Sequence, residues 1–78
     1  MQDFNKLALS ANIEDKLKAV QDHACPGEII TAILNHDAID WTSKDNAVLT
    51  RSIFTLVVTH PNTDLYALMS IFSYFFLF

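Results

Sequence analysis

The scarcity of residues that interrupt regular structure constrains this chain more than any other feature of its sequence. Its 78 residues include one glycine, Gly27, and two prolines, Pro26 and Pro61. The sequence contains no Asn-Gly or Asp-Gly pair, the usual signal for a two-residue hairpin turn. Long segments without such breakers favour helices over strands. We therefore expect an all-α protein.

Apolar residues at helical spacing predict three helices in the first half of the chain. The first is expected at Asp3–Leu9. Asn12 can cap the second, with Asp15 three residues later at the capping-box position. The third begins at Cys25-Pro26-Gly27-Glu28, because proline suits a helix start and an early glutamate favours the positive end of the helix dipole.

Two further helices are expected in the second half, beyond a loop at Asn35–Trp41 from which Ile39 and Trp41 are expected to fold inward. Thr42 begins the fourth helix. Within it, Ile53–Thr59 is rich in β-branched residues and could form a strand, but a lone strand would have nothing to pair with, so we prefer a helix. The fifth covers Asp64–Phe78, capped by Asn62 or Thr63. Residues 1–78 should thus form one domain, a compact bundle of about five short helices.

Charge is distributed unevenly along the chain, and the last expected helix is strongly apolar. Thirteen of the fourteen charged residues lie at or before Arg51, and the final 27 residues carry only Asp64. A helix that is apolar all round is either buried or part of an interface, and four short helices are too few to enclose it. We therefore expect a partner-binding surface formed by Tyr66, Met69, Phe72, Tyr74, Phe75, Phe76 and Phe78.

The same apolar segment raises the question of a membrane. A helix over Leu65–Phe78 would be about 21 Å long, which is short of the ~30 Å hydrocarbon core. A membrane span is therefore disfavoured, while shallow insertion into a membrane surface stays open. Asp3 lies where a signal peptide carries positive charge, and no long apolar region follows it. We expect a cytoplasmic protein with a reduced Cys25.

The charge balance argues against direct nucleic-acid binding. The formal net charge is −4, and the five lysines and arginines are scattered among nine acidic residues. Nucleic-acid-binding proteins instead gather basic residues to neutralise phosphates.

Few residues offer catalytic or metal-binding chemistry. Cys25 follows His23 closely and could act as an activated thiol, but a helix-capping position explains it better. His23, Cys25, His36 and Asp40 could in principle share a metal, although no CxxC or HxxxH spacing occurs. Phosphate-binding loops and nucleophile elbows are also missing from the sequence. We expect no catalytic residue, no metal and no cofactor, and hence not an enzyme.

Parts of the first fifty residues resemble the helical leader domain of nitrogen-fixation-type natural-product precursor peptides. In this chain Ala38 stands where that family favours glycine, and Ile39 where it favours an aromatic residue. The resemblance implies a leader-like domain that a modifying enzyme recognises. It is carried by Phe4, NIEDKLKAV at Asn12–Val20, CPGEIITAI at Cys25–Ile33, and AIDWTSKD at Ala38–Asp45.

Taken together, these patterns favour a small non-catalytic protein–protein interaction protein, acting as a regulator, adaptor or inhibitor through an aromatic-rich helical surface. A homodimer is the default expectation, since symmetric dimers are the commonest oligomers. The alternatives are a membrane-surface protein held by the last helix, and a leader-like precursor domain.

Overall fold

The fold was analysed in a computed structural model that describes the backbone of residues 3–75 and the side chains of residues 3–74. Within this range the chain forms five α-helices, one turn of 3₁₀-helix and no strand, which confirms the predicted all-α bundle. The elements are α1 (Phe4–Leu9), α2 (Ile13–Gln21), α3 (Gly27–Leu34), η1 (Lys44–Asn46), α4 (Ala47–Thr59) and α5 (Leu65–Phe75).

The start of α2 follows the sequence prediction in part. The Asn12 side chain accepts a 3.0 Å hydrogen bond from the backbone N–H of Glu14 and caps the helix as expected. Asp15 does not complete a capping box. Its carboxylate instead accepts a 2.6 Å hydrogen bond from the Ser10 hydroxyl, whose oxygen accepts from the Asn12 N–H at 3.1 Å. In a capping box the Asp15 carboxylate would accept directly from the Asn12 N–H. Here the Ser10 hydroxyl lies between these two groups and forms a hydrogen bond with each.

The start of α3 explains the only glycine. Pro26 is the N-cap and Gly27 the first helical residue. A Cβ atom at Gly27 would lie 2.5 Å from the Asn62 carbonyl oxygen, so only glycine lets the α4–α5 connection approach this closely. In the loop after α3, Ile39 and Trp41 are both buried, as the sequence predicts.

The second half departs from prediction at two helix starts. The helical segment begins after Ser43 rather than Thr42, because the Ser43 hydroxyl accepts from the Asp45 N–H at 3.2 Å and caps η1. Residues 53–59 are helical and belong to α4, so the strand alternative is wrong. The cap of α5 is Asp64, not Asn62 or Thr63, since its carboxylate accepts from the Ala67 N–H at 3.0 Å.

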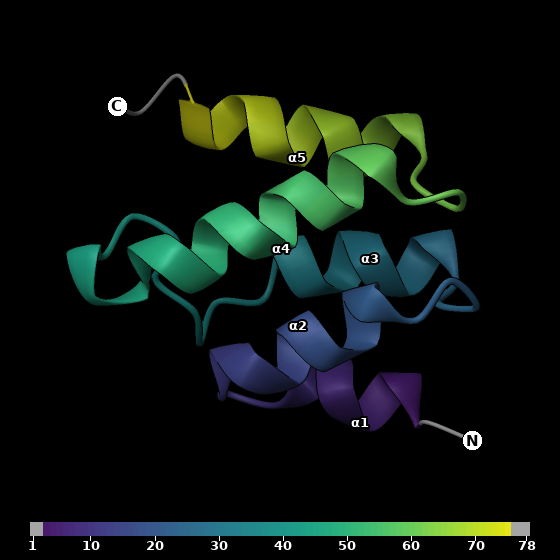
Figure 1. Ribbon diagram of the computed structural model, residues 1–78, viewed down its shortest axis with the longest axis horizontal. Coiled ribbons are helices and arrows are strands. Elements are labelled where there is room, and N and C mark those ends of the chain that lie inside the picture. The colour runs from purple at the N-terminus through teal and green to yellow at the C-terminus, as the bar shows by residue number, and fades with distance from the viewer. Residues whose placement is uncertain (1–2, 76–78) are drawn as a thin grey trace.

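Helix α3 lies at the centre of the packing, between α1 and α5, while α2 packs on both α1 and α4. Figure 1 shows α5 along one edge of the bundle and α1 along the opposite edge. The Cα radius of gyration is 11.2 Å, close to the ~11.5 Å expected of a folded chain of this length. The most deeply buried apolar side chains come from four helices: Val20, Ile30, Ile33, Leu34, Ile53, Val57 and Ile71.

Candidate interaction surface

Helix α5 has one face in the core and one face in solvent. Ala67 and Ile71 are 0% and 1% exposed and pack inward. On the other side lie Leu65, Met69 and Phe72, at the i, i+4 and i+7 spacing that places side chains on one helical face, and Tyr66 lies beside them. We call these four residues, Leu65, Tyr66, Met69 and Phe72, the α5 stripe.

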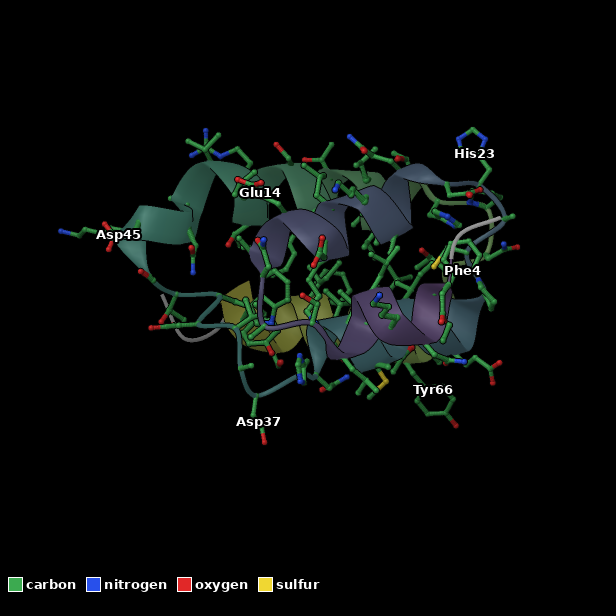
Figure 2. The ribbon with its side chains drawn as sticks, turned by 90° about the horizontal axis from the view of Figure 1, so that it is seen from below. Phe4, Glu14, His23, Asp37, Asp45 and Tyr66 are labelled. Carbon is green, nitrogen blue, oxygen red and sulfur yellow. The ribbon has the colours of Figure 1, made fainter. Side chains whose placement is uncertain are left out.

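The α5 stripe is unusually apolar for a surface facing water. Its four side chains are 56–70% exposed, and they make up four of the seven large apolar residues that are exposed in the described part of the chain. Figure 2 shows Tyr66 pointing away from the bundle. Leu65–Phe75 contains no charged residue. The stripe exposes on the order of 500 Å² of apolar surface, which lies within the ~300–600 Å² range of the largest apolar patch on a typical monomer, a patch that is often functional.

Hydrogen bonds made by Asn62 and His60, in the α4–α5 connection, anchor the N-terminal end of α5. The side-chain N–H₂ group of Asn62 donates to the carbonyl oxygens of His23 at 3.1 Å and Cys25 at 3.0 Å. The backbone N–H of Asn62 donates to His60 Nδ1 at 3.1 Å, so the ring proton of His60 lies on Nε2 and is donated to the Asp22 carbonyl oxygen at 2.9 Å. The α4–α5 connection is thereby fixed on the α2–α3 connection.

Aromatic packing anchors the C-terminal end of α5. The ring of Tyr74 stacks on Phe54 with centroids 5.8 Å apart and lies 6.4 Å from the ring of Trp41. Its hydroxyl donates a 2.7 Å hydrogen bond to the Leu34 carbonyl oxygen. Because α5 is held at both ends, the α5 stripe is presented on a rigid element rather than on a loop.

The seven residues predicted to form the partner-binding surface fall into three groups. Tyr66, Met69 and Phe72 lie together on the exposed face. Tyr74 is half-buried and engaged within the chain. The side chain of Phe75, and Phe76 and Phe78 entirely, fall outside the described residues. Leu65 shares the helical spacing of Met69 and Phe72 in the sequence, at i+4 and i+7, but is not among the predicted partner-binding residues; the structure adds it to the surface.

Cys25 does not have the environment of a nucleophile. It is fully buried, and its thiol lies 3.8 Å from the Pro26 carbonyl oxygen. Burial, followed by the negative charge of Asp22, raises the pKa of the Cys25 thiol from 9.0 to about 11. The reactive thiolate is therefore scarce near neutral pH.

The candidate metal ligands are engaged in other contacts. His36 Nδ1 lies 2.7 Å from the amino group of Lys16, which is completely buried and also donates to the Ala8 carbonyl oxygen. Burial lowers the pKa of Lys16, while neighbouring Asp15 acts in the opposite direction. Asp40 accepts from the backbone and hydroxyl of Thr42. Within residues 3–75, no group of three or more His, Cys, Asp or Glu residues is arranged to hold a metal ion.

Comparisons with known proteins do not bear on this surface. Protein-family models, curated proteins and solved structures gave no match to the chain. Over the described range, none of the helices is both long enough and apolar enough to cross a bilayer.

Proposed function

We propose that this chain is a small non-catalytic interaction protein, and that the α5 stripe is its binding surface. The observation that carries the proposal is the exposure of four large apolar side chains on an uncharged helix that is anchored at both ends. Exposed apolar surface of this extent costs free energy in water, and burial against a partner recovers it. A regulator, adaptor or inhibitor can use such a surface without any catalytic group.

A second copy of the chain is the partner that fits the α5 stripe most directly. Two stripes packed face to face would bury on the order of 1,000 Å², which is the lower limit for a specific interface. The stripe carries no charge, so no like-charged groups would meet across a symmetric contact. Because the area is near that limit, we expect a reversible dimer with a dissociation constant on the order of micromolar.

Sedimentation velocity over a range of protein concentrations tests this proposal. The disrupting variant is Met69→Glu combined with Phe72→Lys, which leaves the net charge unchanged and adds a helix-supporting pair at i, i+3 spacing. We expect the wild-type chain to pass from monomer to dimer as its concentration rises, and the variant to stay monomeric while keeping its helical circular dichroism.

A matched control places the same two charges elsewhere. Leu9 and Val48 are 73% and 79% exposed, at the end of α1 and in the first turn of α4. Leu9→Lys with Val48→Glu should dimerise like the wild type. A wild-type chain that stays monomeric at about 300 μM, well above a micromolar dissociation constant, would contradict the proposal. If that monomer sedimented with neutral lipid vesicles, the stripe would be a membrane-binding surface instead.

A further inference from the structure

A second candidate site lies away from the α5 stripe, beside the start of α4. A hollow of about 440 Å³ opens between the loop at residues 41–44 and one face of α4, with Ile71 from the inward face of α5 also in its wall. Trp41 and Phe54 supply most of the aromatic surface, with ring centroids 5.5 Å apart. The volume lies within the ~300–1,000 Å³ range of small-molecule sites.

The charge of this hollow is opposite to that of the protein. The chain carries a net charge of −4, yet the charged residues that line the hollow are Lys44 and Arg51, and no acidic side chain lines it. Among the described residues, neither of these cations forms an ion pair. The hollow therefore combines an apolar wall with two positively charged side chains that form no ion pair within the described residues.

Two buried polar atoms in the same wall have no hydrogen-bond partner in the described part of the chain. They are the indole N–H of Trp41, a residue 4% exposed, and the hydroxyl of Thr50, a residue 8% exposed. A buried polar group without a partner costs about 1–3 kcal/mol, so two of them among the residues that line one hollow call for an explanation. Both groups can donate a hydrogen bond to an oxygen atom.

We propose that this hollow binds a small carboxylate with an apolar body, such as a medium-chain fatty acid or an aromatic acid. The carboxylate lies between Lys44 and Arg51, and its oxygens become the missing acceptors for the Trp41 and Thr50 donors once these side chains turn toward the hollow, since both donor atoms are closed to solvent in the empty structure. The apolar body packs on Phe54 and on the exposed side chain of Val58, which also lines the hollow. A monoanion suits two solvent-accessible cations and a mostly apolar wall better than a doubly charged phosphate does, because the phosphate would lose more hydration on entering.

Trp41 is the only tryptophan in the chain and thus serves as a built-in probe. Titration with octanoate, followed by the single indole N–H signal in a ¹H–¹⁵N spectrum and by Trp41 fluorescence, should move both signals in a saturable manner. Octan-1-ol, which has a similar apolar body without the charge, should bind at least about 10-fold more weakly than octanoate.

Variants separate the charged contact from the apolar one. Arg51→Gln and Lys44→Gln should each weaken octanoate binding several-fold and leave the response to octan-1-ol unchanged. Lys18→Gln, at an exposed lysine outside the hollow, is the matched control and should bind octanoate like the wild type. The Met69→Glu/Phe72→Lys variant should also bind normally, which keeps this test independent of the α5 stripe.

Two results would overturn the proposal. The first is no saturable response to octanoate, and the second is equal affinity for octanoate and octan-1-ol. If octanoate has no effect, a chain shortened to residue 75 identifies the reason: an indole signal that changes on shortening would assign the hollow to residues of the chain itself.

Discussion

Tyr74 and Leu34 are joined by a 2.7 Å hydrogen bond from the phenol hydroxyl to the backbone carbonyl oxygen at the end of α3. Carbonyl groups in the last turn of a helix have no partner within that helix, so the Tyr74 hydroxyl satisfies one of them from 40 residues away. This bond fixes the C-terminal end of α5 and hence the direction in which the α5 stripe faces.

Replacing Tyr74 with phenylalanine should lower the free energy of unfolding by about 1 kcal/mol, since the aromatic packing stays and one hydrogen bond is lost. Burial, and secondarily Asp37, raises the pKa of Tyr74 above 10.0. The unfolded chain therefore releases this proton first, and wild-type stability falls as the pH rises above 10. Urea unfolding at pH 7 and pH 10.5 should show a smaller gap between wild type and Tyr74→Phe at the higher pH.

Cys25 should react with a thiol reagent only when the chain unfolds. Below pH 9 the thiol is protonated in both states, whereas between pH 9 and 11 the unfolded chain loses the proton first. Stability should fall across that window by at most about 3 kcal/mol, and Cys25→Ala should remove this part of the alkaline decline. Rapid labelling of the folded chain at pH 7 would contradict the buried, protonated thiol.

Gly27→Ala should destabilise the fold, although alanine usually stabilises a helix relative to glycine by about 1 kcal/mol. The new methyl group would clash with the Asn62 carbonyl oxygen, so the α4–α5 connection would have to shift, at a cost of about 1–3 kcal/mol. Thermal unfolding measures the sign directly. Asn5→Ala, at an exposed position of α1, is a control that should change stability by less than about 0.5 kcal/mol.

Thr50→Val should stabilise the empty protein and weaken carboxylate binding. Removing a buried hydroxyl that has no partner should raise the free energy of unfolding by about 1 kcal/mol. Thr59→Val is the control, because the Thr59 hydroxyl is exposed and already donates to the Thr55 carbonyl oxygen. A Thr50→Val chain that is less stable than wild type would show that the hydroxyl has a partner in solution.

Much of the fold could be predicted from local sequence signals. Asn12 caps α2, the breakers Pro26 and Gly27 mark the start of α3, and the size and type of Trp41 predict that this loop residue is buried. The two helix starts depend on contacts within a few residues, whereas the burial of Trp41 also uses the distant rings of Phe54 and Tyr74. The all-α class follows from the local signals, because long segments without breakers leave few other ways to satisfy the backbone.

The sequence predictions are wrong where a side chain forms hydrogen bonds to residues far away in the sequence. Asn62 does not cap α5: its side-chain N–H₂ group donates to carbonyl oxygens of the α2–α3 connection, which holds this side chain there, and the Asp64 carboxylate caps the helix instead. The apolar character of Tyr74 predicts a surface residue, whereas its hydroxyl donates a hydrogen bond to the Leu34 carbonyl oxygen within the chain. The burial of Lys16 was not foreseen either, since its acceptors belong to α1 and to the loop after α3.

The α5 stripe can be observed directly through one of its own residues. The chain has two methionines, Met1 and Met69, so a sample labelled with methyl-¹³C methionine gives two signals, and Met69→Leu identifies the second. We predict that the Met69 methyl signal shifts as the concentration rises from about 1 to about 500 μM, a range that begins near the expected dissociation constant, and that Phe72→Lys abolishes the shift. A Met69 signal that stays constant over this range would contradict self-association through the α5 stripe.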